Sequence, residues 1–278
     1  MKYLIVKPVG GLANRMRVLE SAYNCSKEHN GNLIVIWERN SSLNAKYSDC
    51  FRSIDGVRVI EAEYNNNSIF AKFKGKIFDS IKDIGVAFFT QKKLYDADIS
   101  PYLVNDQPLD EAKTFFGKLA KQNKGLYIET CYEWYPNISA FRLNIQETIR
   151  KKAAASLQNH PTVIGIHIRR TDNADSINNS PLEKFIEEIN SNLKSFPSSA
   201  FYLSTDSDEV VQQLRYIFKE KIITGVSVRT RDSKEGITSA LIDLYCLSQC
   251  KIILGSFKSS FSERAAIIGN IPLQIVAV

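Results

Sequence analysis

Apolar runs alternate with amphipathic stretches through much of this 278-residue chain, a pattern typical of α/β proteins. In the first part of the chain, two apolar runs predict strands and two amphipathic stretches predict helices. The strands are expected at residues 2–9 and 32–37, and the helices at 16–29 and, after the segment 125–135, at 139–158. Residues 40–125 have no clean period, so the pattern assigns no element there.

The second half of the chain has the clearer pattern. Five apolar runs alternate with four helical segments, so that each helix connects one strand to the next. The strands are expected at 162–168, 200–205, 221–225, 251–256 and 273–278, and the helices near 181–195, 207–220, 238–249 and 260–269. This order predicts a parallel, Rossmann-like sheet flanked by helices. We therefore expect two α/β domains, residues 1–140 and 141–278.

The composition is that of an ordinary globular protein, with 44% hydrophobic and 24% charged residues. The net charge of +6 comes without a clustered basic stripe, which argues against a nucleic-acid partner and suits a small anionic ligand. No run of 18 apolar residues predicts a transmembrane segment. Lys7 and a glycine pair interrupt the first apolar run too early for a signal peptide. We expect a cytoplasmic protein.

The five cysteines lack the spacing of a metal site or of a disulfide framework. Cys246 and Cys250 lie four residues apart in an apolar, helical stretch. We expect them to be buried free thiols.

Polar residues follow three of the predicted C-terminal strands. Arg169 and Arg170 follow the first strand, Asp206 follows the second, and Ser259 and Ser260 come shortly after the fourth. Because parallel strands place their carboxyl ends at one edge, where open α/β sheets bind ligands, these residues are expected to line one rim. Two guanidinium groups at such a rim predict an anionic ligand such as a phosphate.

The two arginines are expected to differ in role, because successive strand residues point to opposite faces. Arg169 shares a face with Gly165, whose missing side chain would leave room for a ligand. We therefore assign the ligand contact to Arg169. Arg170 is expected to pair with Asp172 or Asp206, and structural salt bridges by both arginines are the alternative.

The serine pair allows two compatible roles. Ser259 and Ser260 precede a helix whose fourth residue is Glu263, which is a capping-box pattern. The same helix start also suits a phosphate, because its free N–H groups and the two hydroxyls are hydrogen-bond donors.

The segment 205–209 allows two interpretations that exclude each other. Asp206 and Asp208 form an Asp-x-Asp pair, which binds a metal in some sugar-transfer enzymes. Asp206 with Glu209 instead forms a helix-capping pattern, and acidic residues are common in a first helical turn. We favour the capping interpretation and expect no metal.

The segment GGLANR at 10–15 follows the first strand and lacks both the dinucleotide-binding and the P-loop fingerprint. Gly10 and Gly11 permit close approach of a ligand to the backbone. Asn14 and Arg15 then stand at the opening of the next helix. A tight turn with an Asn cap explains the spacing equally well.

Together these segments resemble the fucosyltransferase superfamily that includes nodulation and α-1,6-fucosyltransferases, the α-1,2 enzymes and the protein O-fucosyltransferases. The segments that carry the likeness are HIRRTD at 167–172, FYLSTD at 201–206, ALIDLYCLSQCKIILGSFKSSFSERAA at 240–266 and GGLANR at 10–15. The likeness covers the start of the chain and its C-terminal half, and residues 40–125 have no counterpart in it.

The resemblance implies a GT-B-like fold of two Rossmann-like halves that face a cleft. It also implies inverting transfer of fucose from GDP-fucose without a metal or other cofactor. Arg169 would contact the β-phosphate and stabilise the departing GDP, since a preorganised cation is effective where charge develops. The other residues with an implied role in donor binding are Gly11, Asn14, Arg15, His167, Arg170, Asp172, Asp206, Asp243, Ser259 and Ser260.

The resemblance does not identify the general base. The related α-1,6 enzymes carry a Glu in the loop after the arginines, where this chain has Ile177, and Asp175 is the substitute that we expect. Lys258 is an extra residue relative to the family pattern; it either contacts phosphate or shifts the register of the serines. The glycan acceptor is expected on the N-terminal half and on the polar loop 173–180.

Two alternatives to fucose transfer stay open. One is a transferase for another nucleotide sugar, such as GDP-mannose. The other is a catalytically silent nucleotide-binding or glycan-binding module of the same fold.

Overall fold

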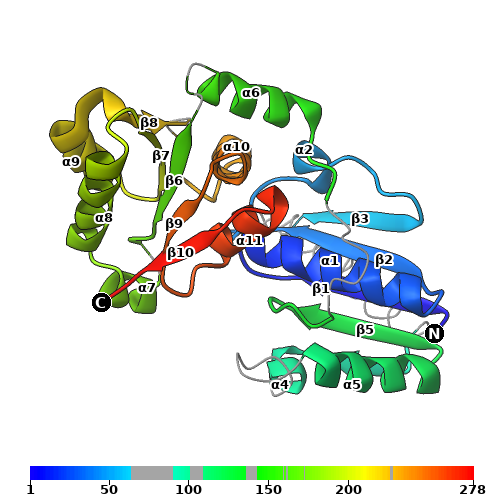
Figure 1. Ribbon diagram of the computed structural model, residues 1–278. Coiled ribbons are helices and arrows are strands. Elements are labelled where there is room, and N and C mark those ends of the chain that lie inside the picture. The colour runs from blue at the N-terminus through cyan, green and yellow to red at the C-terminus, as the bar shows by residue number, and fades with distance from the viewer. Residues whose placement is uncertain are drawn as a thin grey trace. The chain divides into compact units, whose positions relative to one another are not determined.

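The computed structural model describes residues 1–63, 90–100, 109–135, 143–158, 160, 162–171, 173–225 and 228–278. The chain separates into two compact units, Met1–Asn144 and Ile145–Val278, and each contains one five-stranded sheet with flanking helices (Figure 1). The predicted α/β class is confirmed. The predicted domain boundary at residue 140 lies outside the described residues.

The sheet of the N-terminal unit has the strand order β3-β2-β1-β5-β4, and each neighbouring pair is parallel. Its strands are β1 (Tyr3–Pro8), β2 (Asn32–Arg39), β3 (Val57–Glu63), β4 (Lys92–Leu94) and β5 (Gly125–Thr130). The central strand β1 buries Leu4 and Val6 completely, which explains its apolar sequence.

The helices in the described part of this unit are α1 (Leu12–Glu28), α2 (Tyr47–Cys50), α4 (Asp96–Ile99) and α5 (Leu109–Gln122). Helix α1 packs on β1 and β2, and α5 packs on β5. An ion pair of 3.2 Å between Lys113 and Glu28 joins α5 to α1. The structure thus places β3, β4, α2, α4 and α5 within the stretch 40–125, to which the sequence pattern assigned no element.

The sheet of the C-terminal unit has the order β10-β9-β6-β7-β8 and is parallel throughout. Its strands are β6 (Val163–Ile168), β7 (Ala200–Thr205), β8 (Ile222–Thr224), β9 (Ile253–Ser256) and β10 (Leu273–Val276). All five were predicted. The predicted parallel, Rossmann-like sheet is therefore confirmed for this unit.

The helices of this unit are α6 (Glu147–Leu157), α7 (Ala174–Asn179), α8 (Leu182–Ser195), α9 (Asp208–Phe218), the 3₁₀ turn η2 (Lys219–Lys221), α10 (Lys234–Ser248) and α11 (Ser260–Gly269). Helix α6 begins later than the expected 139–158, since residues 143–146 are not helical. The polar stretch 173–180 was expected to be a loop, but it contains α7.

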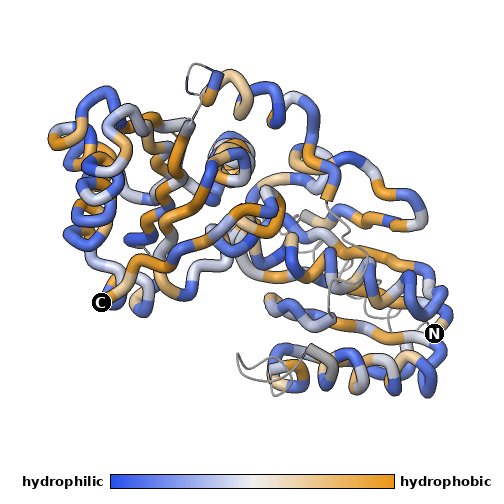
Figure 2. The backbone as a smooth tube through the Cα atoms, in the orientation of Figure 1, coloured by the Kyte–Doolittle hydropathy of each residue, from blue (hydrophilic) through white to orange (hydrophobic). Residues whose placement is uncertain are grey.

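The two faces of this sheet are covered differently. Ile164, Ile166 and Ile168 point to one face and pack with side chains of α8 and α9. Helices α10 and α11 contact the sheet on the opposite side (Figure 1). Figure 2 shows the hydropathy of each residue along the chain: the strands are mainly apolar, and the helices contain both polar and apolar residues.

The strand order of this sheet reverses between β6 and β9. From β6 the chain continues through β7 to β8, and it then crosses to β9 and β10 on the other side. In open α/β sheets such a switch point leaves a crevice outside the carboxyl ends of the strands. The fold therefore puts the predicted ligand site at the carboxyl ends of β6 and β9.

All five cysteines are free, and Cys246 and Cys250 are buried, which confirms the sequence interpretation. Burial raises the pKa of the Cys246 thiol to about 12, so it stays protonated and unreactive at neutral pH. In the part of the chain that the structure describes, no helix has both the length and the apolar character needed to cross a membrane.

Candidate functional site

His167 lies at the end of β6 and is buried at the β6–β9 switch point. Its ring stacks on that of Phe261 with centroids 4.8 Å apart, and its Nδ1 is 3.3 Å from Oγ of Ser259. Burial, together with the nearby Arg169 cation, lowers the pKa of His167 to about 3. The imidazole is therefore neutral at physiological pH and acts as a fixed hydrogen-bonding group.

The end of β6 is tied to the end of β9 through one hydroxyl. Oγ of Ser256 donates to the carbonyl oxygen of His167 at 3.2 Å and accepts a hydrogen bond from the backbone N–H of Arg169 at 3.1 Å. These two bonds fix where the strand ends. Arg169 therefore comes directly after the carboxyl end of β6, as predicted.

Asp206, at the end of β7, organises the arginine turn. Its carboxylate accepts hydrogen bonds from the backbone N–H of Arg170 at 2.7 Å and from Oγ1 of Thr171 at 2.7 Å. Its Oδ2 also lies 3.6 Å from Nε of Arg169. Both side chains of that pair remain about one-fifth exposed, so the guanidinium is held by an acid and still reaches solvent.

The Arg170 side chain does not form the expected ion pair with Asp206. The guanidinium of Arg170 donates to the carbonyl oxygens of Arg169 at 2.9 Å and of Ser180 at 2.8 Å. The carboxylate of Asp206 instead accepts a hydrogen bond from the backbone N–H of Arg170 and forms an ion pair with the side chain of Arg169. The other expected partner, Asp172, lies outside the described residues.

The room that we expected at Gly165 is occupied by protein. A side chain added there would lie 3.0 Å from Leu247 and 3.4 Å from Cys250, both of which belong to or follow α10. The glycine therefore allows α10 to pack closely on β6. Gly165 therefore offers no room for a ligand.

The helix α11 begins at the same switch point. Ser259 is its N-cap residue, but the hydroxyl of Ser259 caps no backbone N–H and is directed to His167 instead. The predicted capping box with Glu263 is therefore wrong. Without a capping side chain, the N–H groups of the first turn keep their capacity for an acceptor from outside the helix.

Asp206 is also not a helix cap. Ser207 caps α9, because its hydroxyl accepts the N–H of Val210 at 3.3 Å. Asp208 forms an ion pair with Arg229. Within the described ranges no group of three or more His, Cys, Asp or Glu side chains is arranged to hold a metal ion.

Lys258 precedes the start of α11 in a left-handed backbone conformation, with φ of 50°. Such a conformation is uncommon for a residue other than glycine and marks a constrained turn. The ammonium of Lys258 lies 3.1 Å from Oδ2 of Asp175, the candidate base on α7, and both side chains are more than half exposed. The carboxylate of Asp175 therefore faces the loop between β9 and α11.

Helix α7 is anchored to that loop by two serines. Oγ of Ser176 donates to the carbonyl oxygen of Phe257 at 2.6 Å, and Oγ of Ser180 accepts the N–H of Phe257 at 2.8 Å. Asn173 caps the helix by accepting the N–H of Ser176. These bonds explain why a short polar segment forms a defined helix beside the arginine turn.

Asp243 lies on α10 and faces the neighbouring strand β7. Its two carboxylate oxygens accept hydrogen bonds from the hydroxyls of Tyr202 at 2.6 Å and Ser204 at 3.3 Å. Burial raises the pKa of Asp243 to about 6, and the two hydroxyls oppose the rise. The carboxylate is therefore a poorly solvated negative charge close to the carboxyl edge of the sheet.

Arg229 is a residue at this edge that the sequence interpretation missed. Its Nε donates to the carbonyl oxygen of Thr205, the last residue of β7, at 3.1 Å. Its side chain is only 18% exposed. No motif marks Arg229 in the sequence, because it lies in an irregular segment and its partner is distant along the chain.

In the N-terminal unit, the segment after β1 also stands at a switch point, between β1 and β5. Gly10 has φ of +79°, a conformation that favours glycine, and a side chain added at Gly11 would meet no atom within 4 Å. Gly11, and not Asn14, is the N-cap of α1. Oδ1 of Asn14 is buried and accepts no hydrogen bond from the described residues.

Arg15 does not occupy the position that we predicted. Its side chain is completely buried and donates to the carbonyl oxygens of Gly10 and Glu38 and to the side chain of Asn40. Its guanidinium also lies 5.1 Å from the ring of Trp37. This geometry makes Arg15 an internal support for the ends of β1 and β2 and leaves it no surface for a ligand.

The described segments thus form an α/β protein with two parallel sheets of the GT-B type. No protein-family model matches the chain, and no curated protein matches it. Solved structures do match in fold. The fucosyltransferase NodZ from Bradyrhizobium is 18% identical, with 95% of this chain and 91% of that chain covered and a TM-score of 0.63.

Two further structures are similar over nearly the whole chain. A variant of FUT1 from Arabidopsis thaliana, in complex with GDP, is 14% identical, with 99% of this chain and 70% of that chain covered and a TM-score of 0.60. POFUT1 in complex with GDP-fucose is 11% identical, with 100% and 99% covered and a TM-score of 0.59. At these identities the likeness is one of fold.

Proposed function

We propose that the chain is an inverting, metal-independent glycosyltransferase that moves fucose from GDP-fucose to a glycan acceptor. One observation carries the proposal. The guanidinium of Arg169 stands at the β6–β9 switch point, 3.6 Å from the acid that orients it, next to an uncapped helix start. The fold shared with fucosyltransferases that bind GDP or GDP-fucose supports this assignment.

The chemistry requires positive charge where the sugar departs. When the bond between the anomeric carbon of fucose and the β-phosphate oxygen breaks, the electron pair stays with the diphosphate. In this proposal Arg169 binds the β-phosphate through its planar donors, and the N–H groups at the start of α11 bind the remaining oxygens. Both groups are held in place before the charge develops, so little reorganisation opposes the transition state.

Inversion follows from a single displacement. The acceptor hydroxyl attacks the anomeric carbon from the face opposite GDP, and its proton passes to a carboxylate. Asp175 is our candidate for that base, because α7 holds it beside the loop that leads to Ser259. The ion pair with Lys258 requires the carboxylate form of Asp175, which is the form that accepts a proton.

Selection of the nucleotide falls to Asp243 in this account. Guanine presents two adjacent N–H donors, which match the two oxygens of a carboxylate. Tyr202 and Ser204 orient that carboxylate, and burial leaves it poorly solvated. We therefore expect Asp243 to favour guanine strongly over a base that lacks two adjacent N–H donors.

A silent binding module is the second candidate. The observation in its favour is that Lys258 occupies the carboxylate of Asp175, so that the base carries a partner other than an acceptor. Such a module would bind GDP without turnover. A transferase for another GDP-sugar would keep the same phosphate and guanine contacts and differ only at the sugar.

The test measures release of GDP from GDP-fucose and from GDP-mannose, with and without EDTA. The proposal predicts faster release from GDP-fucose and no effect of EDTA. Strong inhibition by EDTA would contradict metal independence. Release of GDP from GDP-mannose alone would show that GDP-mannose, and not GDP-fucose, is the donor. Thermal stabilisation by GDP, without release of GDP from either sugar nucleotide, would favour a binding module without catalytic activity.

A further inference from the structure

The edge of the C-terminal sheet at which the strands begin, across from the carboxyl edge, combines cationic side chains with exposed apolar ones. Because the sheet is parallel, the starts of β9, β6, β7 and β8 lie side by side along this edge. The helices that precede these strands end there too. This surface is remote from the proposed transfer site, which lies at the carboxyl ends of the same strands.

Direct contacts join the surface across the strands. Nζ of Lys221, before β8, donates to the carbonyl oxygen of Pro197, before β7, at 2.7 Å. Nζ of Lys251, before β9, lies 5.5 Å from the ring centroid of Phe196. A shallow pocket of about 570 Å³ then continues from Lys251 to Arg150 and Lys151 on α6.

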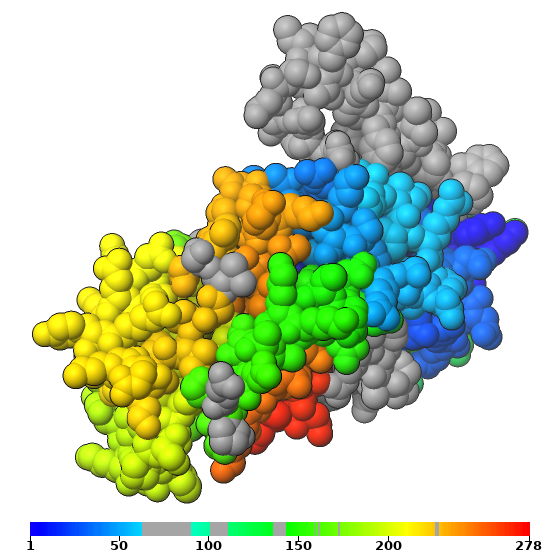
Figure 3. Space-filling model, turned by 90° about the horizontal axis from the view of Figure 1, so that it is seen from above, coloured from blue at the N-terminus to red at the C-terminus, as the bar shows by residue number. Residues whose placement is uncertain are grey.

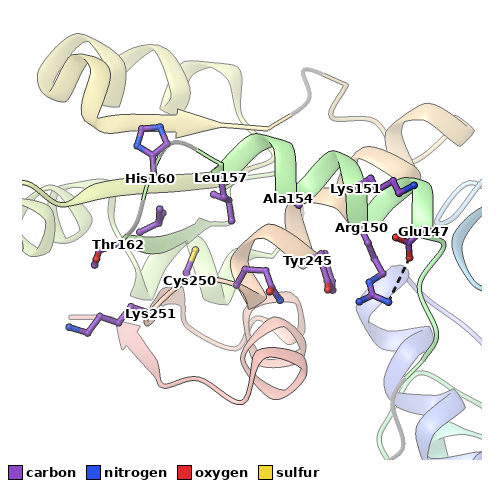
Figure 4. A pocket seen from close by; sticks show the side chains of 12 residues that line it. Glu147, Arg150, Lys151, Ala154, Leu157, His160, Thr162, Tyr245, Cys250 and Lys251 are labelled. Carbon is purple, nitrogen blue, oxygen red and sulfur yellow. Dashed lines mark ion pairs between the residues drawn. The ribbon is translucent and has the colours of Figure 1, made fainter.

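The charge on this edge is positive. The cationic side chains along it are Lys194, Lys219, Lys221 and Lys251 at one end and Arg150 and Lys151 at the other. Glu220 lies among the first group, and Glu147 pairs with Arg150 at 3.8 Å. Figure 4 shows that the three cations of the pocket, Arg150, Lys151 and Lys251, are spread along it and do not converge on one point, which suits an extended anionic surface better than one small anion.

Large apolar side chains are exposed in the same segments, since Phe196 contacts Lys251 and Tyr216 and Ile217 shortly precede Lys219 in the chain. Tyr216 is 86% exposed, Phe196 58% and Ile217 46%. Cations near helix ends compensate helix dipoles, so Lys194 by itself would need no further explanation. The dipole does not account for two aromatic rings and an isoleucine that extend into solvent next to them.

We propose that this surface, which we call the amino-edge face, docks on an anionic lipid bilayer. Lysines that border exposed Tyr, Phe and Ile are the combination that binds such a surface, because the cations meet the headgroups while the rings enter the interfacial layer. Figure 3 shows the segment of α9 and η2 (yellow) and helix α6 (green) on one face of the molecule. The attachment is peripheral and leaves the carboxyl edge of the sheet pointing away from the lipid.

The test is sedimentation of the full chain with vesicles of phosphatidylcholine alone or with about 30% phosphatidylglycerol. We expect binding only to the anionic vesicles, and loss of most of it at high salt. Each cation contributes about five-fold to such binding. The double substitution Lys219→Glu with Lys221→Glu should therefore weaken it by at least ~20-fold.

Matched controls separate a specific face from net charge. Lys118→Glu with Lys121→Glu, on α5 of the other unit, removes the same charge and should leave binding within about two-fold. Tyr216→Trp supplies a direct readout, since the native Trp37 and Trp134 are both buried. Its emission should shift to shorter wavelength with anionic vesicles only.

Three results would overturn the proposal. One is equal binding to both kinds of vesicle, or to neither. Another is equal loss in the control pair, which would indicate net charge alone. The third is binding to heparin or to a second copy of the chain that depends on Lys219 and Lys221 while vesicles are ignored, which would assign the face to another partner.

Discussion

The carboxylate of Asp206 bridges the side chain of Arg169 and the backbone of the next residue. Its Oδ2 is 3.6 Å from Nε of Arg169, and its Oδ1 accepts the N–H of Arg170 at 2.7 Å. One acid therefore fixes both the direction of the guanidinium and the turn that carries it. We assign Asp206 as a positioning residue for Arg169.

Replacing Asp206 tests this role. Asp206→Asn keeps an acceptor for the backbone and removes the charge, and Asp206→Ala removes both. We expect kcat to fall about 10-fold in the first variant and 100-fold or more in the second, because a misplaced cation stabilises the transition state poorly. Steady-state kinetics with GDP-fucose check this. Equal activity of both variants and the native chain would show that the contact does not orient Arg169.

The buried His167 predicts a particular dependence of stability on pH. Its pKa is about 3 in the folded chain and about 6.5 when unfolded, so the unfolded chain binds the extra proton between these values. The stability that it contributes is complete above pH 6.5 and decreases as the pH falls toward 3, by roughly 2 kcal/mol at pH 5. Denaturant titrations of the native chain and His167→Gln measure this.

The variant should lose less stability than the native chain between pH 7 and pH 5. Parallel decreases in the two proteins would contradict a neutral, buried imidazole. For the same reason, the pH profile of transfer should lack a step from His167.

For Asp243 we expect the free energy of unfolding to depend on pH with the opposite sign. Its pKa is raised to about 6, so the folded chain binds a proton more readily than the unfolded chain does. Its stabilising contribution is largest below pH 3.8 and is lost as the pH rises through 6, a difference of about 3 kcal/mol. Asp243→Asn removes the unfavourable charge and should melt higher than the native chain at pH 7.5. The difference should disappear toward pH 4.

The same substitution should weaken GDP binding by at least ~10-fold, since the amide offers one acceptor and one donor to the guanine edge. Calorimetric titration with GDP measures the effect. A variant that is more stable and binds GDP normally would remove Asp243 from nucleotide selection.

The exposed pair of Asp175 and Lys258 predicts a functional effect without a structural one. Ion pairs between solvent-exposed side chains contribute about 0–1 kcal/mol, so Asp175→Asn should change the melting temperature little. If the carboxylate accepts the acceptor proton, transfer should fall at least ~100-fold while GDP affinity stays within about three-fold. Lys258→Met, which frees the acid, is the matched control and should retain proton transfer. Normal transfer by Asp175→Asn would assign the base elsewhere.

The strands that carry the site could be read directly from the sequence. β6 and β7 are buried on both faces, so they are continuous apolar runs, and the residues just after them had to meet at one edge. β3 and β4 were missed because β3 mixes charged and apolar residues and β4 is only three residues long. α7 was missed because its six residues are mostly polar and show no helical period, and its structure depends on contacts with Phe257.

The partners of the arginines could not be read in the same way. Alternation along a strand placed Arg169 and Arg170 on different sides, but the regular geometry ends with Ile168. Beyond that point the direction of each side chain depends on Asp206 and Ser180, which come from other parts of the chain. Arg15 was misassigned for the same reason, since its acceptors include Glu38 and Asn40.

The most direct measurement compares GDP and GMP binding to Arg169→Ala and Arg170→Ala by calorimetry. We expect the native chain to bind GDP more tightly than GMP, because only GDP carries the β-phosphate that Arg169 is proposed to contact. Arg169→Ala should lose most of this preference, while Arg170→Ala should keep the preference and lose stability. Retention of the full GDP preference by Arg169→Ala would contradict the account.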